Sequence, residues 1–222
     1  MADMRVTLVT NAGGAERIPD LGRVGVQHNP RMANRDWSRA AAYAVLALTV
    51  AQLLVATALP DLDQFEGKAF GWRLVAYPLM MLATPALWWL SQRRSARVEP
   101  VPWGAFTLVM APFLIDVTGN SLDLYDTLAW WDDANHFVNW MLLCSGIGLL
   151  VCRRVEPRWA VVVVVTGIGA LLAVGWELGE WFAFIRHGTE IDTAYEDTLG
   201  DEALGTLGGF VAALLVARRR AQ

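Results

Sequence analysis

Three side chains that bind protons and metal ions stand close together near the middle of the chain. Asp132, Asp133 and His136 all lie within the segment 131–137. Spacings of three and four residues bring side chains onto one face of an α-helix, so either carboxylate can lie beside the imidazole. A carboxylate next to a neutral imidazole suits a divalent metal ion, a proton relay or a simple ion pair. The segment is therefore a candidate site, with all three uses open.

A second pair of acids, Glu177 and Glu180, also has helical spacing. The pair follows an apolar run from Trp159 to Trp176, which a polar side chain interrupts only at Thr166. A carboxylate inside a membrane-spanning helix is costly unless it is paired, hydrated or protonated. A cation bound between the two acids would remove that cost. The alternative is a water-filled vestibule in which both acids are solvated.

Two further pairs repeat the four-residue spacing. Asp197 and Asp201 precede the last apolar segment, where acids also serve simply to cap a helix and complement its dipole. Asp116 and Asn120 follow an apolar stretch, and the alternative for Asp116 is an interfacial acid that points to water. We treat this pair as second-tier members of any site.

Together these pairs predict one polar site at a single membrane depth, shared by four helices. His136 is the one histidine within a predicted helix, and carboxylates dominate, which favours Mg²⁺, Ca²⁺, Mn²⁺ or Zn²⁺. If the site is catalytic, His136 or Glu177 is expected to shuttle the proton. The predicted metal ligands are Asp132, Asp133, His136, Glu177, Glu180, Asp197 and Asp201.

Other chemistries have no support in the sequence. The chain has no phosphate-binding glycine loop, no Gly-x-Ser-x-Gly elbow and no His-Glu-x-x-His motif. It also lacks a basic patch with interleaved aromatic residues on the acidic side, so nucleic acid is not an expected partner.

The elements that must position these residues are apolar helices. The 222 residues are 55% hydrophobic, and the mean hydropathy of +0.35 is typical of a small polytopic membrane protein. We therefore predict an all-α, six-helix transmembrane bundle over 37–222, preceded by a poorly ordered tail over 1–36, with Met32 as an alternative start. The six predicted spans are 37–60, 71–92, 102–120, 134–152, 159–184 and 203–218.

The loops between these spans alternate in charge. Arginines cluster before the first span, in the second and fourth loops and at the C-terminus, at Arg93, Arg94, Arg153, Arg154 and Arg219 among others. The remaining loops are acidic, and their basic residues are Lys68, Arg73 and Arg186. Because positive loops stay inside, both termini are predicted to be cytoplasmic and the acidic site to face outward.

Three blocks of the last two-thirds of the chain resemble the VanZ-like group of small bacterial membrane proteins, and its YjdF-type branch of uncharacterised inner-membrane proteins in particular. The first block, 132–137, is similar to an Asp-x-x-x-His-Phe pattern that Asp132 and His136 match. The second, 176–180, resembles an Asp-Glu-x-x-Gln pattern and carries over Glu177.

The third block, 197–209, resembles an Asp-x-x-x-Asn-x-x-Gly ending, which Asp201 and Gly208 match. Gly205 stands where that pattern has asparagine, and such departures put in doubt any link to glycopeptide-antibiotic resistance. The resemblance implies a bacterial inner-membrane architecture and a site, but no settled activity.

The leading hypothesis is an outward-facing site that binds a divalent cation and acts on, or recognises, a lipid or cell-envelope headgroup, with membrane lipids as partners. Whether it is an enzyme stays open, as do the substrate and the oligomeric state. One rival is an ion-coupled transporter whose carboxylates relay protons or bind the cation in transit. The other is a non-catalytic envelope assembly factor whose acids only hold the bundle together.

Overall fold

The computed structural model describes residues 30–95, 99–183, 185–187 and 194–219, and the side chains of all of these except 30–35, 183 and 187. Every regular element in this part of the chain is helical. The expected tail lies outside the described residues up to position 29, so its disorder stays a prediction. The elements are α1 (Pro30–Ala58), α2 (Phe70–Arg93), α3 (Trp103–Ser121), α4 (Leu124–Thr127), α5 (Trp131–Val151), η1 (Cys152–Arg154), α6 (Arg158–Ala183), η2 (Ile185–His187) and α7 (Ala194–Arg219).

Five helices are long and apolar enough to cross a membrane: α1 from Asp36 onward, α2, α5 together with η1, α6 and α7. The sixth predicted span corresponds to α3, which is not among the five. Its last turns carry Asp116 and Asn120, which lower the mean hydropathy of this 19-residue helix. An all-helical protein with five candidate spans is therefore what the structure supports.

Two helices begin earlier than the hydropathy pattern predicts. Helix α1 begins at Pro30, inside the stretch expected to be tail, and α7 begins at Ala194 rather than near 203. The early start of α7 places Glu196 and Asp197 in its first turn, where the helix dipole favours acids. It also makes Asp201 part of the helix instead of the preceding loop.

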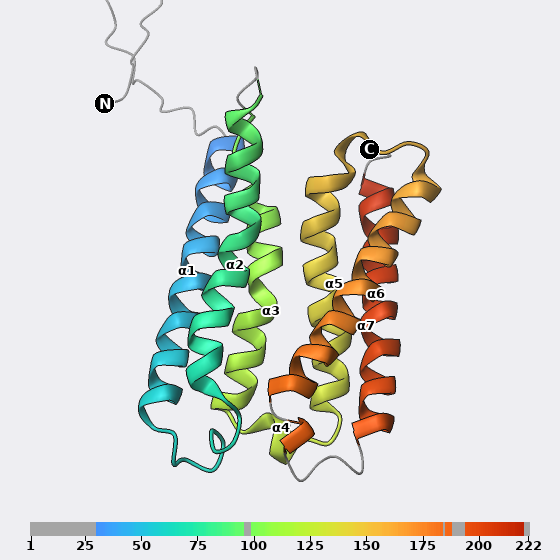
Figure 1. Ribbon diagram of the computed structural model, residues 1–222. Helices are drawn as coiled ribbons and strands as arrows, with labels where there is room; N and C mark the ends of the chain where they lie inside the picture. Colours follow the sequence, from blue (N-terminus) through green and yellow to red (C-terminus); the bar gives the residue numbers. More distant parts are fainter. Residues whose placement is uncertain (1–29, 96–98, 184, 188–193, 220–222) are drawn as a thin grey trace, which may run out of the picture.

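The long helices form two groups, which lie side by side in Figure 1. The N-terminal half consists of α1, α2 and α3, and the C-terminal half of α5, α6 and α7. The first core contains large side chains such as Met81 and Phe106, and the second contains small ones such as Cys144 and Ala212. Helices α3 and α5 pack against each other and join the halves.

Small residues let α7 approach its neighbours closely. A Cβ atom at Gly208 would lie 2.4 Å from the carbonyl oxygen of Phe137 on α5. A Cβ at Gly169 on α6 would lie 3.1 Å from the Cα of Gly209 on α7. The glycine-rich composition of α7 is therefore used for close helix packing, as is common in membrane proteins.

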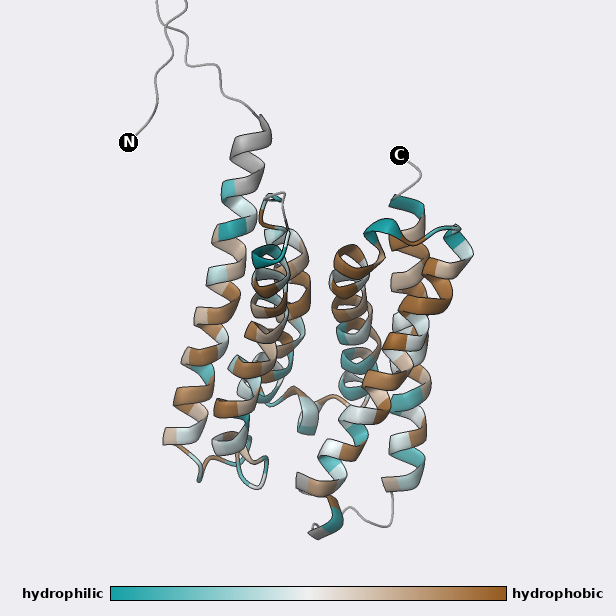
Figure 2. Cartoon of the chain, turned by 45° about the horizontal axis from the view of Figure 1, so that its top comes forward, coloured by the Kyte–Doolittle hydropathy of each residue, from teal (hydrophilic) through white to brown (hydrophobic). Residues whose placement is uncertain are grey.

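Polar residues concentrate toward the ends of the helices. Figure 2 shows hydrophobic residues along their middle and hydrophilic ones toward either end. We call the end that carries α4, at the bottom of Figure 1, the acidic end. The first residues of α2, α5 and α7 and the last residues of α3 and α6 meet there.

Candidate functional site

The imidazole of His136 lies at the centre of a cluster of carboxylates at the acidic end. Helix α5 begins at Trp131, so Asp132 occupies its first turn and His136 follows one turn later. The Nδ1 atom of His136 lies 3.5 Å from Oδ1 of Asp132 and 3.3 Å from its carbonyl oxygen. The local helix spacing therefore produces the contact that the sequence pattern predicts.

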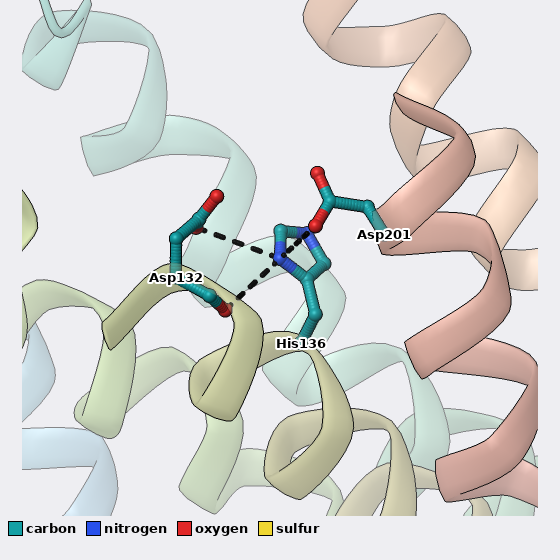
Figure 3. Close-up of side chains that lie close together, drawn as sticks. All are labelled: Asp132, His136 and Asp201. Carbon is teal, nitrogen blue, oxygen red and sulfur yellow. Dashed lines mark hydrogen bonds and ion pairs between the residues drawn. The ribbon is translucent and has the colours of Figure 1, made fainter. Parts of the chain in front are cut away.

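Two more helices bring acids to the same ring. Nδ1 of His136 lies 2.9 Å from Oδ1 of Asp201 on α7. Figure 3 draws this contact together with Asp132. Nε2 lies 3.7 Å from Oε1 of Glu177 on α6. The side chains of His136, Asp201 and Glu177 are 11%, 5% and 7% exposed, so this convergence lies inside the bundle.

The register of α7 explains how Asp201 reaches His136. Asp201, Gly205 and Gly208 are spaced by four and three residues and so share one face of the helix. Gly205 and Gly208 pack against the Trp140 side chain and the backbone of α5. The absence of side chains at these two positions brings α7 close enough for a short aspartate to contact the imidazole.

The ligand atoms form two overlapping groups that share His136. One group contains Asp132, His136 and Asp201, and the other contains His136, Glu177 and Glu180, with the ligand atoms of each within 4.8 Å of one another. Ligand atoms on one ion lie about 3–5 Å apart when its bonds are about 2.0–2.5 Å long. The donor set therefore fits a divalent cation, and it equally fits a hydrogen-bonded Asp–His–Glu arrangement.

The other predicted ligands lie outside both groups. Asp133 is exposed on α5. Asp197 is exposed near the start of α7, although it lines the cavity described below. Asp116 and Asn120 belong to a separate network on the N-terminal half.

That network surrounds the carboxylate of Asp116. Its Oδ2 accepts hydrogen bonds from Arg73 Nη1 at 3.0 Å and from the Tyr77 hydroxyl at 2.6 Å, and its Oδ1 accepts one from the Tyr125 hydroxyl at 2.8 Å. Asn120 donates to the backbone carbonyl of Asp116 at 3.0 Å. Because both of its oxygens already accept from donors, Asp116 is a structural anion here rather than a ligand in either group.

Polar side chains continue from this network toward the C-terminal half. The amide of Asn135 donates to the Tyr125 hydroxyl, and Asn139 donates to Asn135 Oδ1 at 2.7 Å. Both asparagines are on α5, which also carries His136. Helix α4 and α5 thus connect the Asp116 network to the helix that carries the imidazole.

A cavity of about 960 Å³ lies between the halves at the acidic end. His136, Glu180 and Asp201 line it from the C-terminal half, and Arg73 and Asp116 from the N-terminal half. Glu177 is not among its lining residues. Its contact with Nε2 therefore supports the imidazole from behind, whereas Glu180 faces the cavity.

Two groups on α4 have shifted acidities with clear causes. Burial, together with the neighbouring Asp116 carboxylate, raises the pKa of the Tyr125 hydroxyl, so the phenol stays protonated and donates to Asp116. The hydrogen bond from Lys68, 2.5 Å away, lowers the pKa of the exposed Asp126 carboxyl. Lys68 and Arg73 are thus both paired with acids at the cavity.

Five residues that line the cavity are not among the site residues predicted from the sequence: Lys68, Arg73, Tyr77, Asn135 and Asn139. A signal was available for two of them, because Lys68 and Arg73 are rare basic residues in an otherwise acidic set of loops. Asn135 lies within the candidate segment 131–137, although no role was predicted for it. Tyr77 and Asn139 had no signal at all. Their positions in apolar helices give no indication that they face a cavity.

Comparison with known proteins identifies a family but no characterised relative. No curated protein and no solved structure matches the chain. The model of a family described as "Predicted membrane protein (DUF2238)" matches residues 40–222, which include all of the predicted site. With its apolar helices and this match over most of its length, the chain belongs to the DUF2238 family of predicted membrane proteins.

Proposed function

We propose that the protein binds a divalent cation at the His136 cluster and recognises, or acts on, the headgroup of a lipid or cell-envelope molecule in the adjoining cavity. The proposal includes six spans, with α3 as the sixth, and both termini in the cytoplasm of a bacterium. It also includes the VanZ-like, YjdF-type relationship suggested by the three sequence blocks. The acidic end then faces outward from the inner membrane, in agreement with the positive-inside rule.

One observation carries the proposal. Carboxylates from α5, α6 and α7 lie 2.9–3.7 Å from the two nitrogens of His136, and the imidazole lines a cavity. An excess of buried acids around one base is costly in a membrane protein unless a cation, a proton or water compensates it. A bound divalent cation would supply that compensation, with the buried acids as its ligands.

The chemistry of the cluster depends on how it holds protons. Asp132 and Asp201 both face Nδ1, so they orient the ring. That nitrogen carries a proton when the cluster is free of metal, and it would lose this proton to ligate a cation. Nε2 then faces Glu177, which gives the ring a partner for proton exchange. A bound cation would supply a Lewis acid for a water or phosphoryl oxygen, while His136 and Glu177 hold and move the proton.

The location of the cavity supports a lipid or envelope headgroup as the molecule recognised. It opens among the first and last turns of the helices, close to where headgroups lie, and its volume of about 960 Å³ lies at the upper end of the range of small-molecule pockets. A transporter is expected to hold its ligand near the midplane, between repeated units. Acids gathered at one end of the bundle favour a surface-facing site.

Metal content tests the proposal directly. The full chain, purified in detergent without chelators, is compared with Glu177→Gln and His136→Ala by elemental analysis and by calorimetric titration with Mg²⁺, Mn²⁺, Ca²⁺ and Zn²⁺. Near-stoichiometric metal in the wild type, lost in His136→Ala and reduced in Glu177→Gln, is expected.

A wild-type protein that contains no metal, and that shows no heat of binding when it is titrated with these cations, would overturn the cation site. Two further measurements separate the rivals. Proton flux in proteoliposomes that stops in Glu177→Gln and needs no metal would indicate a transporter. Loss of thermal stability in His136→Ala, with no change of phenotype in cells that still express it, would indicate an assembly factor.

A further inference from the structure

We infer that the cavity takes a lipid with a phosphate-bearing headgroup: Arg73 binds the phosphate, and the tail leaves between α2 and α6. This inference rests on the proposed function and specifies its ligand. It is based on residues outside the His136 cluster, most of them on the N-terminal half.

Arg73 is held through one of its guanidinium nitrogens. Its hydrogen bonds to Asp116 and to the Tyr77 hydroxyl, at 3.0 and 3.2 Å, both use Nη1. Among the described residues, no hydrogen bond uses its Nη2 or Nε. The side chain is 16% exposed and lines the cavity, and its guanidinium lies 5.4 Å from the ring centre of Phe70.

An arginine fixed through one nitrogen has its remaining donors oriented in advance. Guanidinium donors match the oxygens of a phosphate in pairs, and less entropy is lost because Asp116 already holds the group. Asp116 neutralises part of the charge of Arg73, but it leaves the outer donors available. The N-terminal half therefore contributes an anion-binding group to a cavity whose other wall carries the candidate cation site.

The cavity also contains an unsatisfied hydrogen-bond acceptor. Oδ1 of Asn139 is buried and has no hydrogen-bond partner among the described residues, although Asn139 lines the cavity. A buried acceptor without a donor costs free energy, which a donor that enters the cavity would recover. A hydroxyl group of a headgroup is a suitable donor for it.

Part of the cavity wall is apolar. Beyond its polar residues, the lining includes Pro112, Phe113, Trp140, Leu143 and Trp176. A soluble phosphate compound has no apolar part to bury against this surface, whereas the first carbons of a lipid tail would be removed from water there. The cavity is thus amphipathic, with its polar part at the acidic end.

The route of the tail follows from how the halves meet. Backbone packing between them runs chiefly through α3 and α5. On α2 and α6 the rings of Tyr77 and Trp176 both line the cavity, with centroids 6.3 Å apart and planes tilted by 45°. A tail that passes beside this ring pair reaches the surrounding lipid without separating α3 from α5.

The test measures lipid binding to the full chain in detergent by native mass spectrometry. The probes are dioleoyl phosphatidic acid, dioleoylglycerol, which lacks the phosphate, and glycerol 3-phosphate, which lacks the tails. The variants are Arg73→Gln and the double variant Arg73→Gln with Asp116→Asn, in which no uncompensated acid is left. Arg93→Gln, exposed at the other end of the same helix, is the matched control.

Phosphatidic acid is expected to bind the wild type about tenfold more tightly than either other probe, and both Arg73 variants are expected to lose about tenfold. Arg93→Gln is expected to bind like the wild type. Equal binding of dioleoylglycerol, or unchanged phosphatidic acid binding in the double variant, would overturn the inference. Glycerol 3-phosphate that binds as tightly as the lipid would overturn the tail route and indicate a soluble phosphate ligand.

Metal content measured on the same samples separates this inference from the proposed function. Lipid binding that depends on Arg73 in a metal-free protein would support the phosphate subsite and remove the cation site. Metal that is bound normally by a double variant, together with unchanged lipid affinity, would leave the cation site and remove the phosphate subsite.

Discussion

The two halves of the molecule treat buried acids in opposite ways. In the N-terminal half, Asp116 accepts hydrogen bonds from Arg73 and from two tyrosine hydroxyls, so its charge is compensated within the protein. In the C-terminal half, His136 is the one basic side chain that contacts Asp201 and Glu177 within the described residues. One acid is paired with a permanent cation, whereas a cluster of acids shares a single titratable base.

This difference separates structural acids from those available to a ligand. A carboxylate with a complete set of donors stabilises helix packing and has little to gain from an added cation. A cluster with more acids than bases gains much from one. Burial alone does not make the distinction, because Asp116 and Asp201 are both largely buried.

The largest effect is expected when the Asp116 carboxylate is removed from the N-terminal half. Asp116→Ala leaves Arg73 without its partner, so we expect a loss of about 3–5 kcal/mol in the free energy of unfolding. A double variant, Asp116→Leu with Arg73→Met, removes both charges and is expected to recover most of this loss. Reversible unfolding in sodium dodecyl sulfate measures both. Equal stability of the single and double variants would contradict a structural pair.

Acids of α5 and α7 in the C-terminal half can be compared by their effect on divalent-cation affinity. Asp201→Asn removes a carboxylate ligand beside His136 and is expected to lower divalent-cation affinity by at least about 100-fold, since residues that only orient a ligand already contribute about 10–100-fold. Asp133→Asn, on the exposed side of α5, is expected to leave the affinity within about twofold of the wild type, because the side chain contacts neither group. Calorimetric titration of both variants decides whether the burial of the acid or its sequence motif defines the site.

The close packing of α7 can be tested through its glycines. Gly208→Ala places a methyl group against the Phe137 carbonyl, so we expect a loss of about 1–3 kcal/mol in stability and weaker cation binding as Asp201 moves away. Gly167→Ala is the control, because a Cβ there meets nothing within 4 Å. It is expected to be neutral or stabilising by up to about 1 kcal/mol. Similar changes in stability in both variants would show that the close α5–α7 contact at Gly208 carries no cost of its own.

The smallest effect concerns the ion pair on the N-terminal side of the cavity. Lys68 lowers the pKa of Asp126, so the pair stabilises the fold above the ordinary pKa of the acid, about 3.8, and this is lost as the pH falls through the lowered value. Since Asp126 is 55% exposed, we expect only about 0.5 kcal/mol. Lys68→Met should remove this part of the pH dependence. An unchanged acid limb of the stability profile would show that the pair contributes nothing.

Part of the candidate site could be predicted because its information is local. The pairing of Asp132 with His136 follows from a spacing of four residues, and that contact is present in the structure. The separation of Asp133 from the cluster could not be predicted, since a spacing of three residues is equally compatible with contact. The rotation of α5 about its own axis, which leaves Asp133 exposed, is set by how this helix packs against α3 and α7.

Asp116 illustrates the limit for residues far apart in the chain. Its spacing to Asn120 resembled that of the other pairs, but its partners Arg73 and Tyr77 come from α2 and Tyr125 from α4. No periodicity within one helix reveals which other helix will supply the donors. Arg73 was visible only as an exception to the charge pattern of the loops.

The apolar helices and the separation of charges between their ends could be predicted from the sequence, because hydropathy and charge patterns depend on neighbouring residues. The packing of the helices was needed to show which acids lie beside His136 and which acid pairs with Arg73. It was also needed to show that a cavity lies between these two groups. Those outcomes depend on the register and approach of α3, α5 and α7, which contacts between distant segments establish.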